Sequence, residues 1–595
     1  MSLMSGLFVG ATGLQTSQNS LHTTAHNLSN IETPGYVRQQ TLHADMTYNN
    51  IANAPVSKMQ IGLGVEYDIV RQVRDEFLDK SYRRETGRSS FYEICQETTK
   101  EIETLLGEFD GVAFQESVGD LWVSVQELAK DPSSAVTKGS FVNTASQFLE
   151  RAQAVYNGLS DYQDNLNARV SELVDRINDL GDEIHELNDA IHREEIGEQE
   201  ANDLRDRRNK AIDELSALAN ISYYTNADGG IEVLVEGVEL VARDRVFHMD
   251  AIVKEEDQGS GFLTPVWPQN MNANVFQKNE EIATEFNTDI GELKSIILAR
   301  GDRRANYTDI NTVSDPQRAY DTYMSGDYTY RKDQKDPTTA VEEDLIPTSK
   351  SIVMKVQAEL DNMVHSLMTE VNNILTGEKD QIDAYYASAA DPKDRDESLL
   401  PKYKVQDVKD GKVQLPEELF VRLGTPRYKE VKIGGVDYYQ YVPEDEYPSH
   451  ADIDDLYTVS NMKINPDLLK TPSLLGEGFV TEDKQVDHAK ADALVEAFNT
   501  SFSSLTPDLT IKYDYRDFYA ALVGQVATEG SVYSSIVAAQ QVATHNLSDS
   551  RDAIMGVSSN EELTNMIKYQ NAYNAASRYI TACNDMLDRL LSSLG

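Results

Sequence analysis

Apolar residues recur every seven positions at both ends of the chain. Within residues 3–29 one such row is made by four leucines: Leu7, Leu14, Leu21 and Leu28. A matching row near the C-terminus consists of Met566, Tyr573, Ile580, Leu587 and Leu594. Because further apolar residues fill positions three or four residues on, each row forms one seam of an α-helix. A single seam is too narrow to build a core, so the pattern predicts a helix at each end that needs a partner helix.

The long middle of the chain alternates between helical and strand-like patterns. Helices are expected at 76–106, 115–130, 141–219 with a break at Gly197, 349–375, 488–504, 515–548 and 560–593. Residues 36–75 are expected to be extended. Runs rich in Val, Ile and Tyr flank glycine pairs at 229–230 and 434–435. The first predicts a β-hairpin within 221–250, and the second predicts short strands between 428 and 442.

A second seam lies inside the longest predicted helix. It consists of Leu166, Val170, Leu173, Ile177, Leu180, Ile184, Leu187 and Ile191. Most apolar helical stripes belong to a core, so packing within its own bundle is favoured over binding a partner helix.

Together these elements predict an α+β multidomain protein. Coiled-coil-like terminal helices and a helical bundle enclose β-containing outer domains inserted in the middle. Four domains are expected from the pattern: a terminal helical assembly domain at 1–60 and 540–595, a helical bundle domain at 61–220, 349–376 and 488–539, a mixed β-containing domain at 221–348, and a variable β-containing outer domain at 377–487.

Charge narrows the classes of partner. The 595 residues include 99 acids and 54 Lys or Arg, for a net charge of -45. Nucleic acid is disfavoured, because its phosphates need Lys and Arg. No apolar run is long enough for a membrane helix, so no membrane insertion is expected. The first twenty residues lack the basic and apolar regions of a cleavable signal.

Candidate catalytic chemistry is sparse. His22 and His26 stand four residues apart, but Thr23 occupies the place of the glutamate of a zinc-protease motif. No phosphate-binding loop, dinucleotide fingerprint or nucleophile elbow occurs. Cys95 and Cys583 are too few for a disulfide framework, and Cys583 falls on the C-terminal seam, as a buried thiol would. No cofactor, metal or catalytic residue is predicted, and the chain is not expected to be an enzyme.

Two sequence motifs resemble a known family. Residues 26–36, HNLSNIETPGY, are similar to the N-terminal signature of bacterial flagellar rod, hook and hook-associated proteins, with Glu32 where Asn is commoner. Residues 561–587 resemble the C-terminal helix of the same family. Residues 36–39 (YVRQ), 202–208 (NDLRDRR, followed by Asn209 in place of Asp), 214–216 (ELS) and 291–296 resemble the members that join hook to filament. The likeness omits 302–345 and 378–455.

The resemblance implies a structural subunit of the flagellum, at the hook–filament junction and extracellular. It implies helical self-assembly, contacts with the hook protein and hook-associated protein 3, an export chaperone, and type III export without signal cleavage. Its expected assembly interface adds the loop residues Asn30, Pro34, Gly35 and Tyr36 to the two heptad rows. A hook or distal-rod protein, and an adhesin or enzyme carried by 378–455, remain as alternatives.

Overall fold

The computed structural model describes residues 3–46, 48–54, 57–107, 114–197, 200–254, 260–310, 316–325, 345–389, 394–444, 453–479 and 488–594. The chain forms two compact units, each built from segments far apart in sequence. Unit 1 comprises Met1–Ser90, Asp175–Met249 and Ala538–Gly595, and unit 2 comprises Phe91–Val174 and Asp250–Val537. The boundary falls within three long helices. The four-domain division expected from the sequence is finer and stays a prediction.

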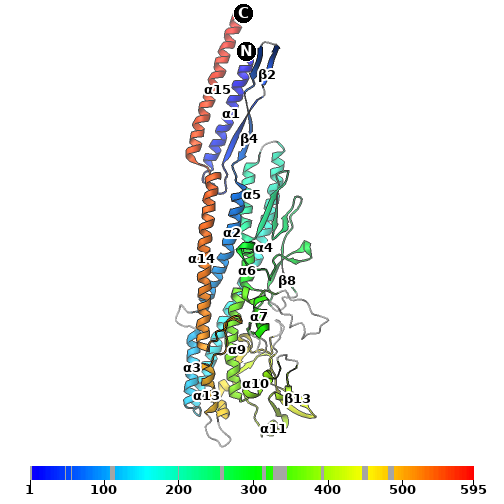
Figure 1. The fold of residues 1–595 in the computed structure, drawn as a ribbon, viewed down its shortest axis with the longest axis vertical. Helices are drawn as coiled ribbons and strands as arrows, with labels where there is room; N and C mark the ends of the chain where they lie inside the picture. Colours follow the sequence, from blue (N-terminus) through cyan, green and yellow to red (C-terminus); the bar gives the residue numbers. More distant parts are fainter. Residues whose placement is uncertain are drawn as a thin grey trace. The chain divides into compact units, whose positions relative to one another are not determined.

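Unit 1 contains the terminal helices and three small antiparallel sheets (Figure 1). Its helices are α1 (Leu3–Ser29), the first part of α2 (Glu76–Leu106), the last part of α4 (Ala135–Glu195), α5 (Asn202–Leu218), the last part of α14 (Tyr515–Met555) and α15 (Ser559–Leu594). Its strands are β1 (Gln39–Asp45), β2 (Tyr48–Ala54), β3 (Ser57–Gly62), β4 (Val65–Gln72), β5 (Ile221–Thr225), β6 (Ile231–Val235) and β7 (Val238–Val241). Strand β1 pairs with β4, β2 with β3, and β6 lies between β5 and β7.

Unit 2 holds the rest of α2, α4 and α14, with short strands between further helices. Its other principal helices are α3 (Phe114–Lys130), α6 (Glu292–Arg300), α7 (Pro316–Ser325), α9 (Ile352–Thr376), α10 (Lys379–Ser388), α11 (Val405–Lys409), α12 (Pro466–Lys470) and α13 (Ala489–Asn499). Its strands are β8 (Asp250–Val253), β9 (Leu263–Trp267), β10 (Ala273–Asn274), β11 (Lys402–Lys404), β12 (Phe420–Arg422), β13 (Tyr428–Ile433), β14 (Val436–Tyr441) and β15 (Met462–Ile464). They form three antiparallel sheets, in the orders β10-β9-β8, β11-β14-β13 and β12-β15.

The predicted α+β class is confirmed, and so are the predicted terminal helices, the hairpin within 221–250 and the strands between 428 and 442, which also form a hairpin. The hairpin between β13 and β14 turns at Gly434 and Gly435, where φ is +57° and +86°. Two consecutive positive φ angles suit the right-handed twist of paired strands, and glycine adopts them without a steric penalty. The seam in α4 packs within the chain, because seven of its eight residues are buried and Leu173 is partly buried.

Helix α9 is the core helix of unit 2. The apolar side of this helix is buried, and its polar side is buried as well. The polar groups have partners: Gln357 donates to Gln163 (2.8 Å), and Asp361 accepts from the backbone N–H groups of Tyr307 (2.9 Å) and Val459 (2.6 Å). A helix covered on all sides needs such bonds because an unpaired buried polar group is costly.

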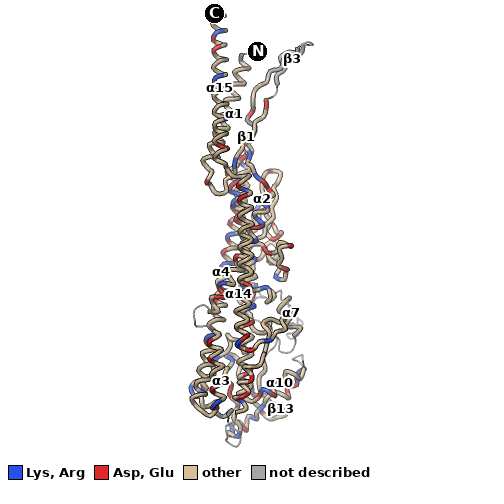
Figure 2. The backbone as a smooth tube through the Cα atoms, turned by 60° about the vertical axis from the view of Figure 1, so that its left-hand side comes forward, with Lys and Arg blue, Asp and Glu red and all other residues tan. Residues whose placement is uncertain are grey.

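Acidic and basic residues are interspersed along both units (Figure 2). Across the part of the chain that the structure describes, no helix is long and apolar enough to cross a membrane.

Candidate assembly surface

The two terminal helices of unit 1 pack against each other in antiparallel directions (Figure 1). Their closest approach uses glycines of α1. A Cβ at Gly10 would lie 2.7 Å from Cγ1 of Ile580, and one at Gly6 would lie 3.3 Å from Sγ of Cys583. Gly13 faces Ala576 at an ordinary contact distance. The 6, 10, 13 spacing places these glycines on one face, so the helix backbones can approach closely. The heptad pattern of leucines did not point to this glycine row. The 4–3 spacing of Gly6, Gly10 and Gly13 in the sequence could have revealed it.

The predicted leucines lie beside this contact rather than at its centre. Leu7, Leu14, Leu21 and Leu28 are all partly buried. The fully buried positions of α1 are instead small or polar: Gly10, Thr16, Ser17, Ser20, Thr24 and Asn27. Several of them face the β1–β4 ribbon, where the Thr41 hydroxyl lies 3.4 Å from that of Ser20. Burial of the four leucines in an assembled wall stays a prediction.

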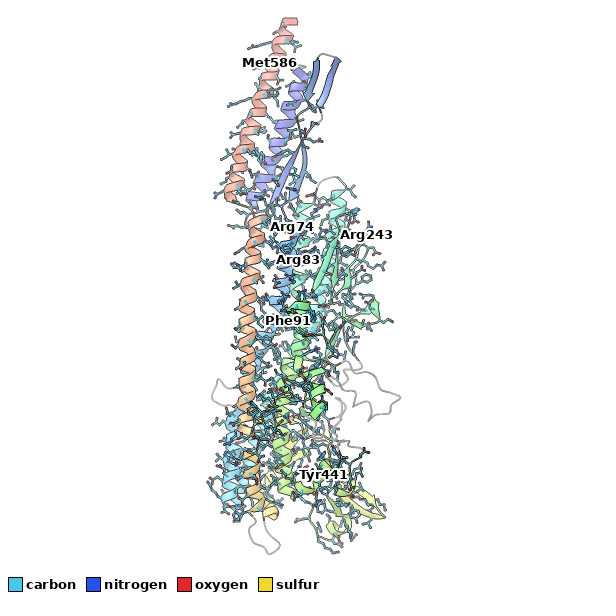
Figure 3. The ribbon with its side chains drawn as sticks, viewed as in Figure 1. Arg74, Arg83, Phe91, Arg243, Tyr441 and Met586 are labelled. Atoms are coloured by element: carbon cyan, nitrogen blue, oxygen red, sulfur yellow. The ribbon has the colours of Figure 1, made fainter. Side chains whose placement is uncertain are left out.

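On α15 the predicted row faces α1 only in part. Met566, Tyr573, Ile580 and Leu587 are partly buried, and Cys583 between them is 4% exposed. Leu594 ends the helix, and its side chain lies outside the described part. Apolar side chains elsewhere on the two helices are exposed: Met4, Phe8, Leu563, Ile567, Met586, Leu590 and Leu591. Figure 3 shows Met586 standing out from α15. Exposed apolar surface of this extent marks an interaction site.

The loop after α1 is held by Asn27. The Asn27 side chain accepts from the Tyr36 hydroxyl (2.8 Å) and from the backbone N–H of Gln39 (3.0 Å), and it donates to the Gln39 carbonyl (2.8 Å). Asn30 accepts from the Thr33 hydroxyl at 3.1 Å. Gly35 has a φ of +81°, which other residues adopt only with strain. Asn30, Gly35 and Tyr36 therefore shape the loop, and Pro34 is exposed on it.

The motif at 202–208 contacts this same loop. Asp206 accepts from the backbone N–H of Val37 (3.2 Å) and from the Gln72 amide (2.7 Å), and Asn202 donates to the Val70 carbonyl (2.9 Å). Burial raises the pKa of Asp206 to about 7, despite the hydrogen bonds and the charge of Arg74 that favour its ionised form. Two motifs that are far apart in sequence thus form one contact, which sequence reasoning did not foresee.

The same loop joins the turn between α14 and α15. The Arg38 backbone N–H donates to the Met555 carbonyl (2.8 Å), and its guanidinium pairs with Glu561 (2.7 Å). Nearby, Arg551 pairs with Asp213 (2.9 Å) and Asp79 (3.0 Å).

A cavity of about 900 Å³ lies between this loop, α5 and the end of α14. Arg74 and Arg83, labelled in Figure 3, lie in the same part of unit 1, and Arg83 pairs with Asp213 at 2.6 Å. Charged groups of both signs occur along the walls of this cavity.

Other candidate chemistry is structural. His26 lies 3.4 Å from Asp203 and edge-on to the Tyr36 ring, while His22 is exposed. Among the described residues, no three His, Cys, Asp or Glu side chains are placed to hold a metal ion.

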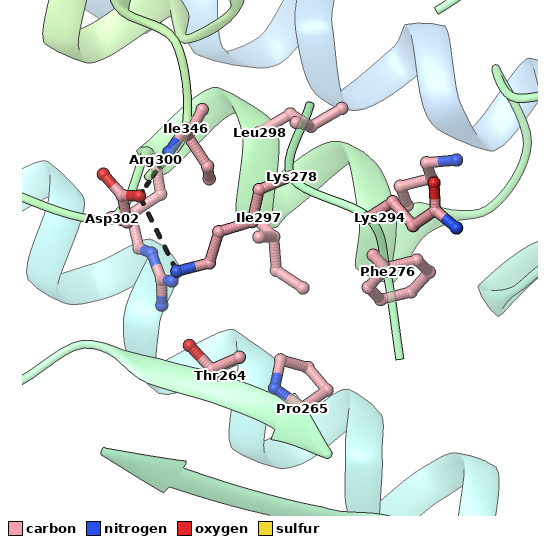
Figure 4. A pocket seen from close by; sticks show the side chains of 11 residues that line it. Thr264, Pro265, Phe276, Lys278, Lys294, Ile297, Leu298, Arg300, Asp302 and Ile346 are labelled. Atoms are coloured by element: carbon pink, nitrogen blue, oxygen red, sulfur yellow. Dashed lines mark hydrogen bonds and ion pairs between the residues drawn. The ribbon is translucent and has the colours of Figure 1, made fainter. Parts of the chain in front are cut away.

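A cavity of about 20 Å³ in unit 2 is lined by Lys278, Lys294 and Asp302 (Figure 4). It has room for about one water molecule. Lys278 approaches Asp302 at 3.8 Å and Lys294 pairs with Glu280 at 2.7 Å, so both ammonium groups serve buried ion pairs.

Comparisons with known proteins agree with this geometry. The family profile described as "Flagellar hook-associated protein FlgK helical domain" matches residues 99–383. A second profile, "Flagellar basal body rod FlgEFG protein C-terminal", matches residues 553–593, which include most of α15.

The chain also aligns over its full length with proteins named flagellar hook-associated protein 1. The chain is 22% identical over 603 positions to flagellar hook-associated protein 1 of Bacillus subtilis, covering 100% of this chain and 99% of that one. It is 21% identical to flagellar hook-associated protein 1 of Escherichia coli, covering 99% and 100%. Among solved structures, the flagellar hook junction protein FlgK from Burkholderia pseudomallei is similar with 12% identity and a TM-score of 0.47, covering 81% of this chain and 100% of that chain.

Paired terminal helices with uncovered apolar side chains define a structural protein that assembles with other subunits. The chain belongs to the flagellar hook-associated protein family, and the resemblance expected from its motifs is confirmed.

Proposed function

We propose that this chain is a structural subunit that joins the flagellar hook to the filament, without catalysis. One observation carries the proposal: α1 and α15 pair with each other yet leave a set of apolar side chains uncovered. An isolated soluble protein gains nothing from such a surface, whereas a subunit of a tube buries it against its neighbours. The full-length likeness to relatives named flagellar hook-associated protein 1 supports the location.

The assembly is heterologous in this proposal. A subunit repeated around and along a tube must offer two different surfaces, one to each neighbour. The exposed side chains of α1, including Met4 and Phe8, belong to one such surface. Those of α15, including Ile567 and Leu591, belong to the other. The predicted rows of Leu7 to Leu28 and Met566 to Leu594 become buried between neighbouring helix pairs.

The partners in this proposal are further copies of the chain, the hook protein on one side and hook-associated protein 3 on the other. An export chaperone covers the C-terminal helix before assembly, because its exposed Leu590 and Leu591 would otherwise associate nonspecifically. The chain leaves the cell through the flagellar type III apparatus with its first residues retained.

Immunogold labelling of detached hooks tests the location. Gold confined to the hook–filament boundary is expected, and hooks from cells lacking the gene serve as the control. Gold along the whole hook would overturn the proposal in favour of a hook or distal-rod protein.

A further inference from the structure

One face of the sheet β11-β14-β13 in unit 2 is packed at the end that holds Tyr441, and the other face is exposed or partly exposed along its length. Successive residues of a strand point to opposite faces, so the strand register assigns every side chain. Tyr441 lies opposite Tyr428, and Tyr439 lies opposite both Tyr403 and Glu430. These residues share the inner face. Tyr441 joins Ile382, Tyr385 and Leu400 in a buried cluster, and it is labelled in Figure 3.

The outer face of this sheet is basic. Lys402 on β11 and Lys429 on β13 both lie opposite Gln440 of the central strand β14. Lys404 lies beside them, opposite Tyr438. All three lysines are exposed. Because β14 separates Lys402 from Lys429, their Cα atoms are about 10 Å apart, twice the spacing of neighbouring strands.

No carboxylate shares this face within the three described strands. The outward positions are Lys402, Lys404, Lys429, Val431, Ile433, Val436, Tyr438 and Gln440. The acids of the strands, Glu430 and Asp437, are exposed but point to the opposite face, where Asp437 lies 3.6 Å from Lys432. Of the acids on neighbouring segments, Asp407 and Asp410 of α11 pair with Lys412. Lys402 donates to the Ser398 carbonyl (3.0 Å) and interacts with the carboxylate of Asp396. The lysine face, defined as Lys402, Lys404 and Lys429, therefore has three ammonium groups against one neighbouring carboxylate and keeps a net positive charge.

We propose that the lysine face docks onto an acidic surface of a neighbouring copy of this chain. Acids outnumber Lys and Arg by 99 to 54, so a second copy offers an excess of carboxylates as partners for these lysines. Complementary charge across an interface fixes its register and disfavours wrong partners. Half-exposed Ile433 and Val436 at the hairpin tip, each 44% exposed, add apolar contact beside the lysines.

This contact is a second interface, separate from the terminal helices. It lies in 378–455, mostly beyond the family profile that ends at residue 383. The inference rests on the proposed function in one respect: assembly holds the copies side by side. At ordinary salt the long-range repulsion between acidic copies is screened beyond about 10 Å, whereas close contacts between lysine and carboxylate persist.

Cross-linking in isolated flagella tests the inference. A zero-length carbodiimide joins ammonium and carboxylate groups that touch. In the dimer band of this chain, linked peptides containing a residue of the lysine face are expected to exceed those containing Lys432, Lys463 or Lys470 by about tenfold. The triple variant K402E/K404E/K429E should lose most of the dimer, and the variant K432E/K463E/K470E, with the same change in charge, should keep it.

The possible results separate the two proposals. An unchanged dimer yield in K402E/K404E/K429E, with gold label still at the hook–filament boundary, overturns the docking inference and leaves the proposed function intact. Absence of wild-type label from the boundary overturns the proposed function. Binding of the purified full chain to polygalacturonate through these lysines, with no effect of the triple variant on the dimer, would assign the face to an acidic polysaccharide and overturn docking between copies.

Discussion

Single residues decide how closely the terminal helices approach. Gly10 has no room for a side chain, because a Cβ would lie 2.7 Å from Cγ1 of Ile580. Gly13, one turn further along α1, has ordinary space next to Ala576, at 3.8 Å. Both residues are helical, so alanine at either position gains about 1 kcal/mol of helix propensity over glycine. The two sites therefore differ in packing alone.

Gly10→Ala is expected to weaken the pairing of α1 with α15, whereas Gly13→Ala should leave it equal or stronger. Forcing a methyl group into a packed contact costs about 1–3 kcal/mol, which exceeds the gain in propensity. Hydrogen exchange of the α15 amides in the full-length chain measures the difference. Equal protection in the two variants would contradict the glycine contact.

Asp206 gives the loop at 30–38 a dependence on pH. Its pKa of about 7 in the folded chain lies above the value of about 3.9 in an unfolded chain. Its contribution to stability is therefore present at low pH and is lost as pH rises through about 7.

Between pH 6 and pH 8 the loss from Asp206 amounts to about 1 kcal/mol. The protection of the α5 amides, corrected at each pH for intrinsic exchange, should fall by that amount in the wild type. Asp206→Asn should remove this part of the pH dependence, because the amide does not titrate in this range. The same slope in both variants would show that another group is responsible.

At the scale of elements, the periodicity of the sequence predicted where helices and strands lie. It did not predict which elements contact one another. The seam from Leu166 to Ile191 is long enough to identify α4, and Gly434-Gly435 identifies the β13–β14 hairpin. Periodicity indicates which residues share a face but not what covers that face. Thus the heptad leucines of α1 indicated the helix, while its buried face proved to be glycine, serine and threonine. The link between Asp206 and Val37 joins residues 169 positions apart, and no local pattern encodes it.

A buried ionic cluster fixes the β11-β14-β13 sheet to the end of α9. Arg427 pairs with Glu378 (2.8 Å) and Glu418 (3.1 Å), and its guanidinium also donates to the Thr376 hydroxyl (3.1 Å). The three charged side chains of this cluster are at most 5% exposed. The positive charge of Arg427 offsets the free-energy cost of removing the two carboxylates from water.

Arg427→Met is expected to destabilise unit 2 by about 3–5 kcal/mol, because it removes the cation that pairs with the buried carboxylates of Glu378 and Glu418. Lys432→Met breaks only the exposed contact with Asp437 and should cost less than about 1 kcal/mol. Both tryptophans, Trp122 and Trp267, belong to unit 2, so urea unfolding followed by their fluorescence reports this unit. Matching midpoints for the two variants would rule out the ionic cluster as a support of the sheet.

At the scale of the whole molecule, folding and assembly draw on different parts of the chain. Unit 2 has a buried core around α9. Unit 1 contains the two terminal helices, whose outer apolar residues are exposed in the single chain. A charge on the terminal helices should therefore spare the fold of unit 2 and block assembly.

Leu21→Asp or Ile580→Asp is expected to abolish filament growth while leaving the urea midpoint of tryptophan fluorescence unchanged. Gln18→Asp and Gln570→Asp add the same charge to exposed positions of the same helices and serve as controls. Filament counts by electron microscopy and swimming in soft agar provide the measurement. Normal swimming by the Leu21 and Ile580 variants would refute the role of the terminal helices.

The reactivity of the Cys583 thiol reports whether the two terminal helices are packed together or apart. Cys583 is 4% exposed and faces Gly6, so a thiol reagent can reach it only when α1 separates from α15. Cys95, the other cysteine, is buried in unit 2, where burial raises its pKa to about 12 and keeps it protonated and unreactive. The rate of thiol labelling in the unmodified protein therefore measures how often the terminal helices separate. Slower labelling in assembled flagella than in the free chain would show that assembly holds these two helices together.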